Sequence, residues 1–135
     1  MRVVQTGVQV LFAFLLTAPL TPAFADLTSL QRTEYFVTLV LAGVAALLLI
    51  APTAYHRLLF RLGDKEYLVM VSNRLTIAGL VAVGMSMVGA LLFVTGVLFG
   101  QAAAVIAGTI AAICYLTLWG VLPVARRRAL SRSAR

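Results

Sequence analysis

The sequence predicts an all-α membrane protein, with four transmembrane helices in one antiparallel bundle that occupies a single domain, residues 1–135. Four long apolar runs predict this class, at about residues 3–24, 35–55, 75–99 and 102–125. Each run supplies the roughly 20 residues that a helix needs to cross the hydrocarbon core of a bilayer. The chain is also 62% hydrophobic and only 11% charged. A water-soluble domain of this size could not bury so much apolar surface.

The positions of the basic residues predict how the chain is threaded. All of the 11 Lys and Arg residues except Arg2 and Arg32 lie between the second and third runs or at the C-terminus. Short segments rich in Lys and Arg remain on the cytoplasmic side of a membrane. We therefore expect a protein of the bacterial cytoplasmic membrane whose two termini and 56–74 link are cytoplasmic. Residues 25–34 and the junction of the last two runs then face outward.

The first run, residues 3–24, has two interpretations. It fits a retained spanning helix whose outer end is kinked by Pro19 and Pro22. It also fits a secretory signal peptide cleaved after Ala25, because small residues precede Asp26. A single positive charge before the run and the polar residues near its start favour the retained helix. The orientation of the later helices is the same in both cases.

The second run is expected to begin as a helix capped by Ser29 or Thr33, since hydroxyl side chains are preferred N-caps. Beyond its inner end, Arg57 and Arg61 share one helical face, and leucines lie largely on the other. This pattern predicts a short amphipathic segment in the headgroup layer.

The third and fourth runs are separated only by Gly100 and Gln101, which predicts a tight antiparallel hairpin. Tyr115 and Trp119 lie near the inner end of the fourth run, where aromatic residues favour the membrane interface. The single cysteine, Cys114, is expected to be a buried apolar filler.

Small residues in the third and fourth runs predict close helix packing. Gly and Ala let backbones approach closely, which is how helices associate where lipid removes the hydrophobic driving force. We expect these residues to pack the third helix against the fourth, and a homo-oligomer contact is the alternative. They are Gly79, Gly84, Gly89, Gly96, Gly100, Ala104, Gly108 and Ala112.

The polar residues of the first run form a candidate stripe. Gln5 and Gln9 are one helical turn apart, and Thr17 and Thr21 repeat that spacing. Hydrogen bonding to a neighbouring helix or contact with headgroups is the first interpretation. The alternative is a polar pathway in a small carrier or channel component that conducts cations or couples to protons.

The acidic residues argue against a coupled carrier. Asp26 and Glu34 are expected in the outer link, and Asp64 and Glu66 in the inner link. Ion-coupled carriers need an ionisable group inside the membrane span. The sequence also lacks metal-ligand spacing, a nucleophile–base pair and a phosphate loop. We expect no catalytic, metal-binding or cofactor-binding residue, no cofactor and no enzyme activity.

The net charge of +7 is explained by membrane topology, and we do not expect a nucleic-acid partner. Basic residues beside a membrane attract anionic lipid headgroups with on the order of 1 kcal/mol each. The bilayer and its anionic headgroups are therefore the expected partners of one basic set: His56, Arg57, Arg61, Lys65, Arg74, Arg126, Arg127 and Arg128.

Three stretches carry a family resemblance: VQTGVQVLFAFLL from Val4, APTAYHRLLFR from Ala51, and SNR from Ser72. Through them the chain resembles, over nearly its whole length, a family of small four-helix integral membrane proteins of unknown function from actinobacteria. The resemblance implies four spans and no defined activity, although some members carry an automatic sodium:proton antiporter label. Relatives have a charged stretch before this first span, which leaves open whether Met1 is the natural start. We expect a non-enzymatic accessory protein that packs with itself or with a larger membrane partner.

Overall fold

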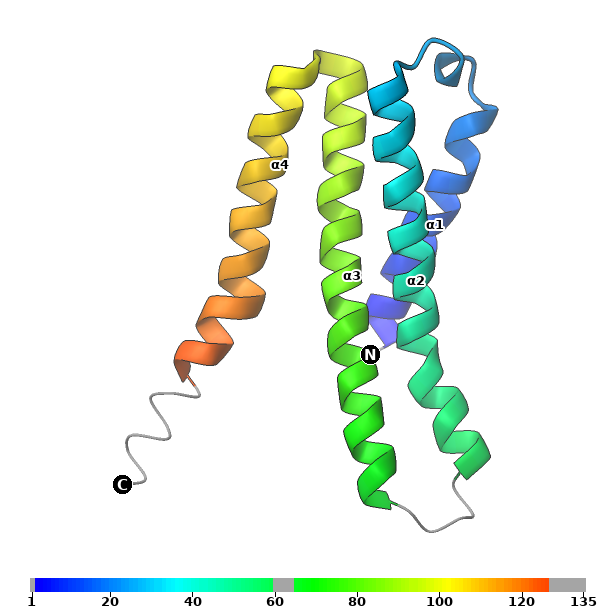
Figure 1. Ribbon diagram of the computed structural model, residues 1–135, viewed down its shortest axis with the longest axis vertical. Helices are drawn as coiled ribbons and strands as arrows, with labels where there is room; N and C mark the ends of the chain where they lie inside the picture. Colours follow the sequence, from blue (N-terminus) through cyan, green and yellow to red (C-terminus); the bar gives the residue numbers. More distant parts are fainter. Residues whose placement is uncertain (1, 60–64, 127–135) are drawn as a thin grey trace.

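The computed structural model describes residues 2–59 and 65–126, and within them it is all-α with no strand (Figure 1). Four α-helices run alternately up and down: α1 (Arg2–Thr17), α2 (Ser29–Leu59), α3 (Lys65–Phe99) and α4 (Gln101–Leu116). Each of the four overlaps a candidate membrane span, and these spans are Val3–Leu20, Ser29–Arg57, Glu66–Phe99 and Gln101–Arg126. The all-α prediction with four helices of spanning length is confirmed.

Short irregular helical segments extend α1 and α4. Two 3-10 turns, η1 (Ala18–Leu20) and η2 (Pro22–Phe24), follow α1, so the α-helix ends earlier than the apolar run. A π-helical segment, η3 (Thr117–Val121), follows α4, and α-helix then continues to residue 126. The prolines of the first run thus end its α-helix instead of bending it.

The four helices form an open arrangement and not a closed bundle. The most extensive contact joins α2 and α3, and α1 lies against this pair. Helix α4 packs mainly on α3 and diverges from it toward the lower end of Figure 1. The four helices therefore do not enclose a common core, because α4 has one principal neighbour.

Two buried clusters hold α1 onto the α2–α3 pair. The first joins Val8 of α1 with Ala45 and Leu49 of α2 and with Ala82 and Val83 of α3. The second joins Leu15 of α1 with Tyr35 and Ala42 of α2 and with Phe93 of α3. Alanines at the contact let α1 lie close to α2, and α1 is therefore an integral part of the packed structure.

The hydroxyl of Tyr35 compensates for a missing bond in α1. In an α-helix the carbonyl of Leu15 would accept from the N–H of residue 19, but Pro19 has no N–H. The Tyr35 hydroxyl instead donates a 2.6 Å hydrogen bond to the Leu15 carbonyl oxygen. The end of α1 is thereby bonded to α2 at a buried position.

We expect Tyr35→Phe to lower the free energy of unfolding by about 1 kcal/mol, because it leaves the buried Leu15 carbonyl without its partner. Denaturation of the detergent-solubilised protein with sodium dodecyl sulfate, followed by circular dichroism, measures this change. Tyr55→Phe is the control, because Tyr55 is exposed. Equal midpoints for the two variants would contradict the proposed role of the Tyr35 hydroxyl.

Helix α2 begins with a capping box. The Gln31 backbone N–H donates to the Thr28 side-chain oxygen at 3.3 Å, and the Thr28 backbone N–H donates to Gln31 Oε1 at 3.0 Å. The expected caps, Ser29 and Thr33, are therefore wrong, and Thr28 is the N-cap. The reciprocal bond needs Gln or Glu three residues after the cap, and only Thr28 has one there.

Helix α2 also continues past Pro52 to Leu59 without a break. The expected separate amphipathic segment is thus wrong at least as far as Leu59, and Arg61 lies outside the described residues. At 1.5 Å per residue, α2 with 31 residues and α3 with 35 are about 46 Å and 52 Å long. Both are longer than the hydrocarbon core of a bilayer, which is about 30 Å thick.

Gly100 alone separates α3 from α4, and the predicted tight hairpin is confirmed. Its φ of 88° lies in the left-handed region that favours glycine. The Gly100 N–H donates to the Gly96 carbonyl and its own carbonyl accepts from the Ala104 N–H, both at 3.2 Å.

Candidate functional site

The candidate polar stripe of α1 does not converge on one site. Gln5 Nε2 donates a 3.2 Å hydrogen bond to the Leu49 carbonyl oxygen of α2, whereas Gln9 is exposed. Thr17 donates to the carbonyl oxygen of Phe14, and Thr21 to that of Ala18. One amide thus bonds to a neighbouring helix and both hydroxyls bond their own chain.

The small residues of α3 face two different helices. A Cβ atom at Gly84 would overlap the Tyr115 ring of α4, and one at Gly89 would overlap the Thr38 hydroxyl of α2. Gly79 also faces α2, since its Cβ would lie 2.9 Å from Leu49. On α4, a Cβ at Gly108 would meet Leu92 of α3.

The remaining small residues lie near the α3–α4 corner or along the groove described below. A Cβ at Gly96 would be 3.5 Å from Ala104, and both residues are buried. Ala112 is partly buried. Glycine therefore brings α3 close to α2 on one side and to α4 on the other.

The predicted basic set lies toward one end of the molecule, as far as its residues are described. His56 and Arg57 lie in the last turn of α2, Lys65 begins α3, and Arg126 ends the described part of α4. His56, Arg57, Arg74 and Arg126 are exposed. Arg61, Arg127 and Arg128 lie outside the described residues.

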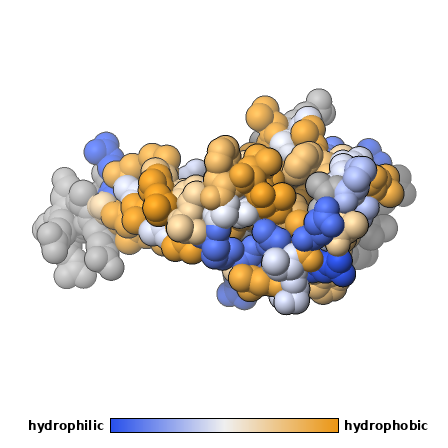
Figure 2. Space-filling view, turned by 90° about the horizontal axis from the view of Figure 1, so that it is seen from above, coloured by the Kyte–Doolittle hydropathy of each residue, from blue (hydrophilic) through white to orange (hydrophobic). Residues whose placement is uncertain are grey.

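The opposite end carries a second polar set. Figure 2 looks onto the end with the link after α1 and the α3–α4 turn, and hydrophilic side chains gather on part of it between hydrophobic ones. Asp26, Arg32 and Gln101 are exposed there, and Arg32 donates to the carbonyl oxygen of Ala25 at 3.1 Å.

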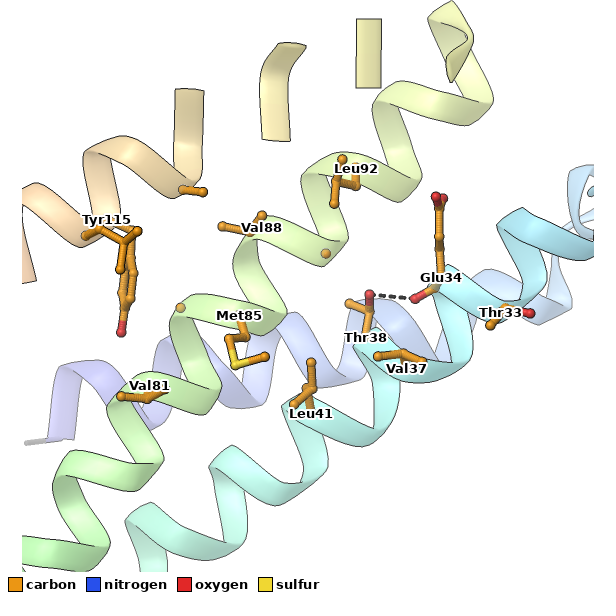
Figure 3. Close-up of a pocket in the computed structure, with 14 residues that line it drawn as sticks. Thr33, Glu34, Val37, Thr38, Leu41, Val81, Met85, Val88, Leu92 and Tyr115 are labelled. Carbon is orange, nitrogen blue, oxygen red and sulfur yellow. Dashed lines mark hydrogen bonds between the residues drawn. The ribbon is translucent and has the colours of Figure 1, made fainter. Parts of the chain in front are cut away.

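An apolar groove with a volume of about 620 Å³ lies between α2, α3 and α4 (Figure 3). It lies where α4 diverges from α3. Its walls are formed mainly by hydrophobic side chains, including Val37 and Leu41 of α2, Met85 and Leu92 of α3, and Tyr115 and Leu116 of α4. The Tyr115 hydroxyl donates to the Leu80 carbonyl oxygen at 2.7 Å, and this bond holds the Tyr115 side chain of the groove wall against α3.

Glu34 places a carboxylate at the end of this groove that is nearest the start of α2. It lies in α2 five residues after the helix start at Ser29, inside the candidate span Ser29–Arg57. Its Oε1 accepts a 3.4 Å hydrogen bond from Gln101 Nε2 at the start of α4. Its Oε2 is buried and has no hydrogen-bond partner in the described part of the chain. Glu34 is therefore not a residue of an exposed link, as the sequence had suggested.

Hydroxyl groups reinforce the α2–α3 wall behind Glu34. Thr38 donates to the Glu34 backbone carbonyl at 2.7 Å (Figure 3). The Ser86 hydroxyl of α3 donates to the Thr38 carbonyl at 3.4 Å, and both side chains are buried. Gln31 adds a 3.4 Å bond to the Gly96 carbonyl oxygen, which holds α2 to the end of α3.

One further residue differs from its sequence-based expectation. Cys114 is exposed on α4 and is not a buried filler. Tyr115 is partly buried against α3, whereas Trp119 is exposed. The side of α4 that carries Gly108 meets α3, and this orientation leaves Cys114 on the outer surface. Across residues 2–59 and 65–126, no group of three or more His, Cys, Asp or Glu could hold a metal ion.

Four apolar helices of spanning length define a fold compatible with a small multi-pass membrane protein. The chain belongs to DUF6328, a family of unknown function whose model matches residues 1–123 and thus includes all of α1. No curated protein and no solved structure matches the chain.

Proposed function

We propose that this chain is a non-enzymatic accessory protein of the bacterial cytoplasmic membrane, as expected in actinobacteria, that packs with a second copy or a larger membrane partner. Both termini and the 56–74 link are cytoplasmic in this proposal, where the basic residues contact anionic headgroups. Helix α1 is retained, because Val8 and Leu15 belong to the two buried clusters that organise α1, α2 and α3.

The proposal rests on the outer face of α4, which is the side of the helix turned away from α3. Only 6% of the apolar 18-residue window in the α4 span is buried within the chain, against 39% of the corresponding window in α3. Exposed β-branched residues form this face: Val105, Ile106, Ile110 and Ile113. Stiff side chains lose little conformational entropy when they pack, so they favour association with another helix as well as contact with lipid. The face is not needed for the fold of the described chain.

Cys114 provides a direct test, because its thiol is exposed on α4. If two copies associate through α4, mild oxidation of native membranes should give a disulfide-linked dimer from wild type and none from Cys114→Ser. The control places a cysteine at exposed Val10 of α1 in the Cys114→Ser background. Cross-linking that is equally efficient from both positions would indicate random collision.

A larger partner is tested by purification in mild detergent and identification of copurifying membrane proteins. A partner retained by wild type and lost from an Ile110→Ala/Ile113→Ala variant would support the proposal. If wild type gives neither a Cys114 dimer nor a partner that depends on these two residues, the proposed association through α4 is wrong.

A small cation or proton-coupled carrier is the second candidate, and Glu34 favours it because this carboxylate lies within the candidate span of α2. Flux into liposomes across Na⁺, K⁺ and H⁺ gradients separates the two functions. An accessory protein should give no flux above empty liposomes. Flux that is lost in Glu34→Gln would favour the carrier, and loss in Gln9→Leu would extend the pathway to α1.

A further inference from the structure

We propose that the groove between α2, α3 and α4 binds a single-chain amphipathic organic cation, with its ammonium group at Glu34 and its apolar chain along the groove (Figure 3). This site is separate from the outer face of α4. The inference therefore does not depend on the association proposed above.

The size of the groove suits a small molecule. Its volume of about 620 Å³ lies within the range of roughly 300–1,000 Å³ that is typical of ligand pockets. From residue 34 to residue 41, the α2 wall rises by about 10 Å. Val37, Leu41, Met85, Val88 and Leu92 line this length, which matches an alkyl chain of moderate length.

The charge at the outer end decides which kind of amphiphile fits. Among the described residues that line the groove, Glu34 is the only charged one. Its Oε2 is buried without a hydrogen-bond partner, and an unpaired buried carboxylate oxygen is costly. Arg32 does not face it, because residues two apart point to different sides of a helix. A bound ammonium would supply the opposite charge that this end of the groove lacks.

The direction of the groove agrees with the orientation of an amphiphile in a membrane. Glu34 lies about 8 Å along the axis from the start of α2, near the outer interface, and the apolar walls continue toward the membrane middle. A phospholipid is a poorer occupant, because its phosphate would bring a second negative charge to Glu34. A neutral alkyl chain would fill the groove but leave the Glu34 carboxylate without an opposite charge.

Equilibrium binding of radiolabelled decylammonium to the protein in phosphatidylcholine nanodiscs tests the proposal, with empty nanodiscs as background. Wild type should bind the amine saturably at one site per chain. Glu34→Gln should weaken binding at least tenfold, because the amide keeps the size of the side chain but not its charge. Glu66→Gln is the matched control, since Glu66 is exposed in the first turn of α3, away from the groove.

A second variant tests the groove without altering the charge. Leu41→Trp should fill the groove and reduce decylammonium binding, while the circular dichroism spectrum remains that of wild type. Decanol has the same chain without a charge and should bind more weakly than the amine, with equal affinity for wild type and Glu34→Gln.

Three results would overturn the inference. The first is equal affinity of wild type and Glu34→Gln for decylammonium. The second is decanol binding as tight as that of the amine, which would show a site for neutral chains. The third is loss of amine binding when phosphatidylethanolamine replaces part of the phosphatidylcholine, which would indicate a phospholipid site.

Discussion

Replacing Gly84 with leucine is expected to separate α4 from α3 near the middle of the hairpin. A Cβ atom at residue 84 would overlap the Tyr115 ring. The ring cannot simply rotate away, because its hydroxyl bonds the Leu80 carbonyl oxygen at 2.7 Å. Overpacking costs about 1–3 kcal/mol, and loss of a hydrogen bond costs about 1 kcal/mol more. The free energy of unfolding should therefore fall by roughly 2–4 kcal/mol.

Trp119 provides a local probe for the Gly84→Leu variant, because it is the single tryptophan of the chain. Its ring lies 5.1 Å from that of Tyr115, so displacement of Tyr115 should change its fluorescence before global unfolding. Denaturation with sodium dodecyl sulfate, followed by this fluorescence and by circular dichroism, gives both readouts. The control is Gly7→Leu, since a Cβ at Gly7 has no atom within 4 Å. Unchanged emission and midpoint in Gly84→Leu would contradict the Tyr115 contact.

The alternation of glycine contacts along α3 follows from helical geometry. At about 100° per residue, Gly84 lies about 140° around the helix from both Gly79 and Gly89, whereas those two are only about 80° apart. Gly79 and Gly89 accordingly face α2, and Gly84 faces α4. The sequence predicted close approach at these positions from residue size alone. We expected these glycines to pack mainly against α4, because the small size of a residue does not identify which helix it faces.

Helix number, helix type and the α3–α4 hairpin could be predicted because each depends on local sequence. Apolar length sets the spans, and Gly100 sets the turn between α3 and α4. The Thr28–Gln31 pair also held local information, since it defines where α2 begins. Recognition of this capping box would have placed Glu34 more than one helical turn after the N-cap.

The groove could not be predicted from the sequence, because it depends on the angle between helices. It exists because α4 approaches α3 at Gly108 and then diverges, which leaves space beside Met85 and Val88. A hydropathy pattern describes one helix at a time and carries no information on this angle. The Tyr35–Leu15 hydrogen bond could not be predicted either. Pro19 indicates that the Leu15 carbonyl lacks its usual helical donor, but not which side chain bonds to it.

Gly89→Val is expected to have the other large effect, because it acts on the most extensive helix contact, α2 with α3. Its Cβ would overlap the hydroxyl of Thr38, which is only 2% exposed. Separation of the helices would also break the bond from buried Ser86 to the Thr38 carbonyl. Overpacking at about 1–3 kcal/mol, with a lost buried bond at about 1–2 kcal/mol, predicts a loss of roughly 2–5 kcal/mol in unfolding free energy.

A double-mutant cycle distinguishes this specific overlap from a general intolerance of valine at position 89. Thr38→Ala removes the hydroxyl that the new side chain would meet, so Gly89→Val should cost less in that background, by about 1 kcal/mol or more. Gly120→Val is the control for the backbone effect, since a Cβ at Gly120 has no atom within 4 Å. Strictly additive losses in the cycle would mean that Gly89 and Thr38 are not in contact. Partial rescue would instead show that glycine is required at position 89 to let the Thr38 hydroxyl reach the Glu34 carbonyl beneath the groove.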